Sequence, residues 1–270
     1  MLFERRKARR VRPWNPLAKD AAALGRSSYH GVVDSQFVSI LPRFGPPSAE
    51  AAEIHTTIRN IILGEGYPCV GSRSAMNKDM YRLGFYGELG SPETARGVCH
   101  DIYEFVREFK NYGNHFVTMM ACFRSPEIRS ELHFEEAIWQ QIRCMHDVDR
   151  QFFDWDPNVS SDPGDSNFSL SLGGRGFFVV GLHPLASRKA RRFPCPVLVF
   201  NLHEQFDRLR QRGKFEMMKT LIRARDQDYA GSINPMVADH GTISEARQYS
   251  GRAVADDWKC PFHAMEKGKK

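Results

Sequence analysis

The stretch Phe116-Val-Thr-Met-Met-Ala-Cys-Phe123 holds seven apolar residues and one threonine. A short apolar run without alternation is typical of a strand that is buried on both faces of a sheet. Helical patterns flank this run. Ser91-Pro-Glu93 begins one helix, because serine caps a helix and proline fits its first turn. Residues 131–147 repeat apolar side chains at spacings of three and four. A buried strand between two helices favours an α/β fold over an all-helical bundle.

The pattern continues outward with further strands and helices. We expect one hairpin with its turn at Gly173-Gly174, since paired glycines adopt the left-handed backbone of a tight hairpin turn. The other strands are expected at 67–74, 80–86, 168–172, 176–181 and 196–200, and the other helices at 50–63 and 204–230. The prediction is an α/β fold, a single domain with a mixed sheet flanked by helices.

Three segments are expected along the chain. Residues 1–48 have weak periodicity and end in the breaker run Pro42-Arg-Phe-Gly-Pro-Pro-Ser48, which predicts a basic, weakly structured N-terminal arm. Residues 49–265 are expected to form the domain, and residues 266–270 a basic tail.

The positive charge is concentrated at the two ends of the sequence. The chain carries 38 Lys and Arg against 32 Asp and Glu, a net charge of +6. Residues 1–12 hold six basic side chains and one acid, and residues 266–270 hold three and one, so the ends carry +7 and the body −1. A nucleic-acid-binding domain normally carries its basic face on the fold itself, so we expect no nucleic-acid partner.

Membrane and secretory signals are not found in the sequence. No apolar run approaches the roughly 20 residues that span a bilayer, and the basic N-terminus lacks the apolar stretch of a signal peptide. We therefore expect a cytoplasmic protein with no membrane partner. The six cysteines form no Cys-x-x-Cys pair, which excludes a zinc ribbon and a thioredoxin motif. We expect no disulfide scaffold in that compartment.

The common nucleotide and hydrolase fingerprints are also missing. The sequence has no Gly-x-Gly-x-x-Gly after a strand, no P-loop, no Gly-x-Ser-x-Gly elbow and no His-Glu-x-x-His motif. Ordinary kinase, NAD-enzyme and hydrolase functions therefore lose their main sequence support.

Polar residues gather around positions 181–205. His183 follows the expected strand 176–181, and His203 follows the expected strand 196–200. If the two strands are parallel neighbours, both imidazoles emerge at one sheet edge, where α/β proteins place ligands. The basic residues between them can pair with an anionic ligand. A solvated connecting loop with two helix-capping histidines explains the same pattern.

Three further stretches carry polar or metal-binding groups. Residues 241–252 are dense in hydrogen-bonding side chains, although a surface loop would look similar. Cys260, which precedes a proline, can ligate haem iron as a thiolate, although a packed terminal cysteine has the same signature. His146 closes the helix 131–147, where a histidine favours the helix dipole, so a structural role is the default.

Together these stretches resemble the YqcI/YcgG family, and specifically its branch of haem-dependent amino-acid and guanidine N-hydroxylases of the guanitoxin and D-cycloserine pathways. The resemblance covers about residues 52–262. The matching segments are Tyr67-Pro-Cys-Val-Gly-Ser-Arg-Ser-Ala75, Phe177-Phe-Val-Val-Gly-Leu-His-Pro-Leu-Ala-Ser-Arg188, Phe200-Asn-Leu-His-Glu-Gln-Phe206, Asn234-Pro-Met-Val-Ala-Asp239, Ser244-Glu-Ala-Arg-Gln-Tyr-Ser-Gly-Arg252 and Trp258-Lys-Cys-Pro-Phe262. The sequence departs from the family pattern at Tyr67, where phenylalanine is common, and at His240, where an aromatic residue is usual.

The resemblance implies a b-type haem protein that oxygenates a nitrogen. The expected activity is that of a monooxygenase that N-hydroxylates an amine or guanidine nitrogen of an arginine-like amino acid in specialised metabolism. The resemblance supports a histidine over a cysteine as the axial ligand. We assign this role to His183 first and to His203 second, and His146 lies in a matching pattern as well.

The remaining site roles also come from the resemblance. Glu245 is expected to pair with a cationic guanidinium and, together with Arg247, to take part in catalysis. The expected cofactor-binding residues are Ser187, Arg188, Arg191 and Arg192, and the other expected substrate-binding residues are Tyr249 and Arg252. Arg247, Tyr249 and Arg252 are expected either to bind the substrate carboxylate or to order the site.

Two other functions stay open at this point. One is a haem carrier or sensor without turnover, and the other is an interaction protein without haem. For the leading hypothesis the cofactor is haem b, with the electron donor or peroxide unassigned. The expected partner is a small-molecule amino acid or guanidine, and a homodimer is left open.

Overall fold

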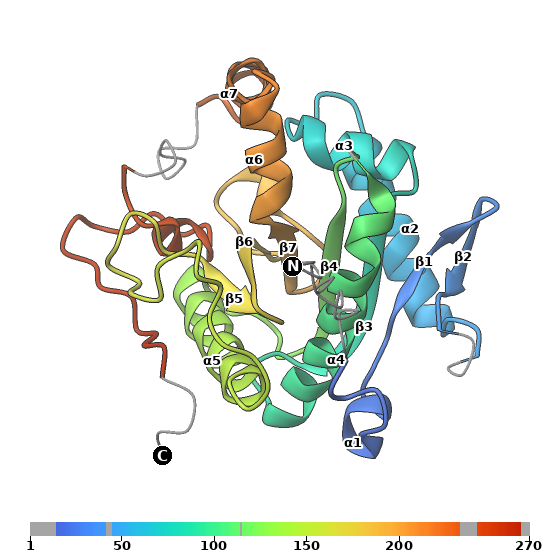
Figure 1. The fold of residues 1–270 in the computed structure, drawn as a ribbon. Helices are drawn as coiled ribbons and strands as arrows, with labels where there is room; N and C mark the ends of the chain where they lie inside the picture. Colours follow the sequence, from blue (N-terminus) through green and yellow to red (C-terminus); the bar gives the residue numbers. More distant parts are fainter. Residues whose placement is uncertain (1–14, 42–44, 114, 233–241, 266–270) are drawn as a thin grey trace, which may run out of the picture.

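The computed structural model describes residues 15–41, 45–113, 115–232 and 242–265 (Figure 1). One seven-stranded sheet has the order β2-β1-β3-β4-β7-β6-β5. Its strands are β1 (His30–Val33), β2 (Gln36–Ser39), β3 (Tyr81–Glu88), β4 (Thr118–Ser125), β5 (Leu170–Leu172), β6 (Arg175–Leu182) and β7 (Val197–Leu202). Strands β3 and β4 are parallel, and the other neighbouring pairs are antiparallel. The sheet is therefore mixed, and the predicted α/β fold is confirmed.

Helices cover both faces of this sheet. They are α1 (Ala21–Leu24), α2 (Ala49–Leu63), α3 (Val70–Asn77), α4 (Pro92–Phe109), α5 (Glu131–Asp149), α6 (His203–Gln211) and α7 (Phe215–Ala230). Buried residues of α4 and α5 form one hydrophobic core with the sheet, and those of α2 and α3 form the other. Figure 1 shows α5 and α2 on opposite sides of the sheet, with α6 and α7 at one end of it.

Strand β4 lies between the two cores, as its sequence predicts. Its side chains alternate: Met119 and Phe123 belong to the core of α4 and α5, whereas Met120 and Cys122 belong to the core of α2 and α3. All four are at most 1% exposed. Residues 119–123 are thus apolar without a break because both faces of the strand are buried.

The local signals at element ends are confirmed as well. The Ser91 side chain accepts a hydrogen bond from the backbone N–H of Thr94, and Pro92 is the first residue of α4. Gly173 and Gly174 join β5 to β6 with φ angles of 62° and 67°, the left-handed backbone that the tight turn requires.

The prediction of a weakly structured arm is wrong for residues 15–41, which contain α1, β1 and β2. The amide of Asn15 donates to Glu104 Oε1 at 2.7 Å and to the carbonyl of His100 at 3.1 Å. The buried Asp101 carboxylate accepts hydrogen bonds from the Ser27 hydroxyl and the Ser28 backbone N–H. These long-range contacts fix the segment against α4, and they leave no mark in local periodicity.

Two predicted elements differ in kind from the structure. Residues 67–74 were expected as a strand, but α3 begins at Val70 because Cys69 Sγ caps it and the small residue Gly71 packs within reach of the Phe116 ring. The expected helix 204–230 is two helices, α6 and α7. It breaks at Gly213, whose φ of 65° cannot continue a right-handed helix.

Several sequence features lie outside the described residues. These are the basic stretch 1–12, the matching segment 234–239, His240 and the basic tail 266–270. Within the described part, no helix has the length and apolar character needed to cross a membrane.

Candidate functional site

His203 stands at the junction between β7 and α6, as the first residue of the helix. Its Nε2 lies 3.0 Å from Glu245 Oε2 and also contacts the Ser169 hydroxyl. That hydroxyl donates to Glu245 Oε1 at 2.7 Å. The start of α6, the residue before β5 and the 3₁₀ turn η4 (Glu245–Gln248) thus meet in one polar cluster.

Tyr249 supports this cluster from the interior. It is fully buried, and its hydroxyl donates to Glu245 Oε1 at 2.6 Å. The backbone N–H of Leu170 donates to the same phenol oxygen at 3.1 Å. Burial raises the pKa of Tyr249 well above its ordinary value, so the phenol keeps its proton and serves as a donor. Two hydroxyl groups and one imidazole therefore hold the Glu245 carboxylate.

The cluster contains the residue types of a serine hydrolase triad but not its geometry. In a triad the serine and the carboxylate contact different nitrogens of the histidine ring. Here Ser169 and Glu245 both contact Nε2 of His203, and Ser169 is fully buried. The arrangement fixes the orientation of the imidazole and does not prepare a nucleophile.

His203 and Glu245 line a cavity of about 210 Å³. Its apolar walls come from β6, α6, α7 and the segment before η4: Phe178, Phe206, Phe215, Met218, Ile222 and Ile243. Three cations also line it: Arg210, Lys219 and Arg223, of which Arg210 pairs with Asp207 and Lys219 with Glu216, each at 2.6 Å. We call this the apolar cavity. An imidazole with a carboxylate partner is thereby placed next to an apolar space with positive charge on its lining.

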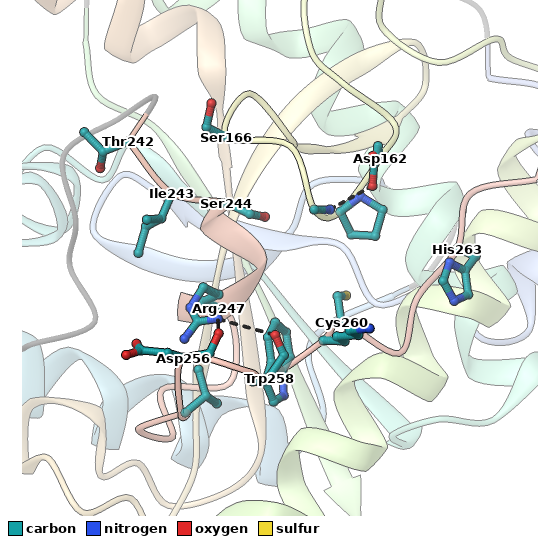
Figure 2. A pocket seen from close by; sticks show the side chains of 14 residues that line it. Asp162, Ser166, Thr242, Ile243, Ser244, Arg247, Asp256, Trp258, Cys260 and His263 are labelled. Atoms are coloured by element: carbon teal, nitrogen blue, oxygen red, sulfur yellow. Dashed lines mark hydrogen bonds between the residues drawn. The ribbon is translucent and has the colours of Figure 1, made fainter.

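A larger and more open cavity of about 700 Å³ adjoins the apolar cavity, and the two share Ser166 and Ile243 in their walls. We call it the open cavity. Figure 2 shows Asp162 and Ser166 on one side of it and Arg247, Asp256 and Trp258 on the other. Its volume lies within the range of about 300–1,000 Å³ that small-molecule sites typically have.

The structure does not place His183 beside His203. Strands β6 and β7 are antiparallel, with Leu182 paired to Val197 and Phe177 paired to Leu202. The expectation of parallel strands is therefore wrong. The two histidines lie at opposite ends of the strand pair, roughly 20 Å apart at a rise of about 3.3 Å per residue.

His183 lies in a packed interior. It is 1% exposed, its ring lies 4.2 Å from that of Phe134 between centroids, and Nδ1 has no hydrogen-bond partner within the described residues. Burial lowers its pKa to about 4, so the ring is neutral at neutral pH. It lines none of the four cavities described for this protein.

The basic residues that follow His183 bind backbone and side chains of the protein itself. Arg188 pairs with Asp226 at 2.8 Å. Buried Arg191 donates to the carbonyls of Gly181 and Gln248, each at 3.1 Å. Arg192 donates to the carbonyls of Ala186 and Ser187, and the Ser187 N–H donates to Glu131. Like His183, none of these four predicted cofactor-binding residues lines the apolar cavity.

The other predicted site residues are divided between the two cavities and the interior. Glu245 lines the apolar cavity and Arg247 the open cavity. Tyr249 lines neither, and Arg252 forms an ion pair with Glu135 at 2.7 Å.

The alternative ligands His146 and Cys260 are held in other surroundings. His146 Nε2 accepts a hydrogen bond from the Met265 N–H at 2.9 Å, and burial lowers its pKa. Cys260 lines the open cavity, but burial raises the pKa of its thiol to about 12. At neutral pH that sulfur is protonated and therefore a poor metal ligand.

The sequence reasoning missed the α7 wall of the apolar cavity and its cations. Phe215, Met218 and Ile222 recur at spacings of three and four, with Lys219 and Arg223 beside them. This apolar and basic stripe on the expected helix was a usable signal. The sequence did not show which part of the fold this stripe faces, because the break at Gly213 sets the direction of α7.

The fold and the site define an α/β protein with a single mixed sheet whose histidine–carboxylate cluster borders an apolar cavity. The chain belongs to the YqcI/YcgG family, whose model matches residues 58–263. It is 25% identical over 211 residues to the uncharacterized protein YcgG of Bacillus subtilis (strain 168), covering 74% of this chain and 82% of the relative. It is 26% identical over 213 residues to the uncharacterized protein YqcI of the same organism, with the same coverage. No solved structure matches the chain.

Proposed function

We propose that this protein is a haem-dependent monooxygenase that N-hydroxylates an amine or guanidine nitrogen of an arginine-like amino acid. The observation that carries the proposal is the His203–Glu245 cluster on the wall of the apolar cavity. The resemblance to the haem-dependent N-hydroxylase branch of the YqcI/YcgG family supplies the reaction class.

The residue types that line the apolar cavity are those of a haem site, but its volume of about 210 Å³ lies below the range of about 300–1,000 Å³ for small-molecule sites, so a haem would extend beyond it. A haem iron takes one or two protein ligands, commonly a histidine, and its macrocycle needs apolar walls. The cavity offers His203, aromatic and aliphatic walls, and three cations, of which Arg210 and Lys219 already pair with Asp207 and Glu216. Within the described residues no group of three or more His, Cys, Asp or Glu could hold a bare metal ion. A haem iron needs no such group, since the porphyrin supplies four ligands.

In this proposal His203, and not His183, would hold the haem iron, through Nδ1 because Nε2 contacts Glu245 and Ser169. Ligating imidazoles are usually oriented by a hydrogen-bonded carboxylate, which also raises their basicity. Glu245 has this position, and Ser169 and Tyr249 fix it. Bound haem supplies the oxygen activation that inserts one oxygen atom into an N–H bond. The apolar wall residues would exclude water from that space, and Arg210, Lys219 and Arg223 would lie near the propionates.

The first test measures haem content by titration of the full chain. Wild-type protein is expected to bind about one haem per chain, and His203→Ala is expected to lose most of it. His115→Ala is the matched control, because this exposed histidine lines neither cavity. The ferrous carbon-monoxide complex is expected to resemble that of a histidine-ligated protein. Full haem retention by His203→Ala, or a thiolate-type spectrum lost in Cys260→Ser, contradicts the proposal.

A turnover assay separates the oxygenase from a haem carrier or sensor. The haem-loaded protein is supplied with peroxide or with a reductant and oxygen, and with candidate amino acids. The oxygenase predicts a product heavier by one oxygen atom in mass spectrometry. A protein that binds haem stoichiometrically and yields no such product under either supply supports the carrier.

A further inference from the structure

Arg247 on the wall of the open cavity has an incomplete set of partners. Its guanidinium donates to the carbonyl of Ala255 at 2.6 Å and, at 3.4 Å each, to the carbonyls of Asp256 and Trp258. An arginine has five N–H donors, so these three contacts leave two. Within the described residues no carboxylate forms an ion pair with Arg247. In the part of the chain that the structure describes, its positive charge therefore faces the cavity without an ion-pair partner, and Asp256 is a carboxylate on the same side of that cavity.

The other predicted site arginines differ from Arg247 in this respect. Arg188 and Arg252 are paired with carboxylates, and Arg191 is buried among backbone carbonyls. Arg192, like Arg247, donates to backbone carbonyls, but it lies on the surface and lines neither cavity. Arg247 is thus the predicted site arginine that lines a cavity and also retains donors.

The surroundings of Arg247 favour a ligand of small size and mixed charge. Its guanidinium carbon lies 5.8 Å from the ring centroid of Trp258, and this cation–π contact restricts the orientation of the side chain. Lys259 lines the same cavity, and Asp162 lies across from Arg247 in Figure 2. A single carboxylate can use the donors of Arg247 in a fork geometry. A second negative charge would meet Asp162, so a molecule with one carboxylate and one cationic group suits the cavity better.

We propose that the open cavity binds an amino acid and that Arg247 anchors its free carboxylate. The two cavities share Ile243 and Ser166, so an amino acid held on Arg247 extends toward the space that His203 borders. This cavity would hold the substrate of the proposed oxygenation, so the inference rests on the proposed function. Its test reads ligand binding and needs no turnover.

The first experiment compares amino acids with the amines that lack their carboxylate. L-arginine and agmatine form one matched pair, and L-phenylalanine and phenethylamine form a second, within a panel of the common L-amino acids. Binding to the full wild-type chain is measured by isothermal titration calorimetry. At least one amino acid is expected to bind about ten- to a hundredfold more tightly than its amine, the factor that a charged hydrogen-bonded pair supplies.

The second experiment changes the anchor. Arg247→Gln is expected to lose that preference and to bind the amino acid about as weakly as the amine. Arg247→Lys keeps the charge without the fork and is expected to recover part of the preference. Arg192→Gln is the matched control, since it removes a surface guanidinium that also contacts backbone carbonyls, and it is expected to behave as wild type.

The outcomes separate this inference from the proposed function. A carboxylate preference that depends on Arg247 in a chain that binds no haem supports the inference and overturns the oxygenase. Haem binding through His203 without any carboxylate preference supports the oxygenase and overturns the inference. The inference is also overturned if no amino acid of the panel binds in the millimolar range, or if Arg192→Gln removes the preference as fully as Arg247→Gln. If Arg247→Gln fails to fold, Arg247→Lys still tests the anchor, and the wild-type comparison shows whether the chain prefers an amino acid to its amine.

Discussion

His183 and His203 follow the two strands of one antiparallel pair, and each has arginines nearby in the sequence, but their surroundings differ. His203 borders a cavity and contacts a carboxylate. His183 lies in a packed interior, and within the described residues its Nδ1 has no partner. The arginines that follow either histidine bind protein groups: Arg191 binds backbone carbonyls, and Arg210 pairs with Asp207. The two histidines therefore differ in the space that the fold leaves beside the ring and in the carboxylate partner of His203.

The His183 region nevertheless supports the His203 region. The N–H of Gly181 donates to the carbonyl of Tyr249 at 2.6 Å, and a Cβ at position 181 would lie 2.6 Å from that same oxygen. Glycine is thus required for this close approach. Arg191 binds the carbonyls of residues 248 and 249 from the same side. The segment that carries Glu245 and Arg247 is held over β6 by these contacts.

The largest effect is expected from removing Arg191. Arg191→Met keeps the length of the side chain but leaves the buried carbonyls of Gly181 and Gln248 without their guanidinium donor. Each unsatisfied buried carbonyl costs about 1–3 kcal/mol, so the free energy of unfolding is expected to fall by about 2–4 kcal/mol in urea denaturation. Arg192→Met is the control, with an expected loss below about 1 kcal/mol because its contacts are at the surface. Equal losses in the two variants would show that the buried contacts of Arg191 stabilise the fold no more than the surface contacts of Arg192 do.

A smaller effect is expected from Glu245→Gln, which tests the other side of the comparison. The variant keeps the shape of the side chain and removes the charge that orients His203. Loss of such a supporting carboxylate typically lowers metal affinity by about 10- to 100-fold, and haem affinity is expected to fall by that factor in competition titrations.

Tyr249→Phe is the matched control for Glu245→Gln. It removes the 2.6 Å hydrogen bond to Glu245 but leaves the carboxylate against His203. Haem affinity is expected to fall less than tenfold, with a loss of about 1 kcal/mol in unfolding free energy. If both variants lower haem affinity equally, the charge of Glu245 does not act through His203.

The sequence predicted the elements whose signals are local. Strand β4 shows its burial in an unbroken apolar run, Ser91 and Pro92 mark the start of α4, and the two glycines at 173–174 mark the hairpin. The segment around Asn15 and Asp20 could not be predicted in the same way. Its order comes from partners on α4 such as Glu104 and Arg96, more than 70 positions away in the chain.

The sequence identified residues of the candidate site better than it identified how they are arranged in space. Glu245 and His203 were both named, and the structure brings them together. The grouping of His203 with His183 failed because the direction of a neighbouring strand depends on chain connectivity, which periodicity does not report. The division of Glu245 and Arg247 between two cavities follows from the single turn of η4, which places nearby residues on different sides of the segment.

The last effect is absent near neutral pH and concerns the acid stability that the buried histidine sets. Burial lowers the pKa of His183 from 6.5 to about 4, so the unfolded chain takes up this proton at a higher pH than the folded protein. The stability contributed by the neutral ring is complete above about pH 6.5 and is lost as the pH falls toward 4. Glu131 and Arg191 are the charged groups that act on the ring, with opposite signs.

His183→Leu removes this titration, so its unfolding free energy is expected to decline less steeply on acidification, by up to about 1.4 kcal/mol per pH unit. At pH 8 the variant is expected to differ little from wild type, because the Nδ1 that it removes has no partner. It is also expected to retain haem, in contrast to His203→Ala. A slope identical to that of wild type between pH 6.5 and 4 would show that His183 gains its proton in the folded state, and loss of haem would return the axial role to the first of the two histidines.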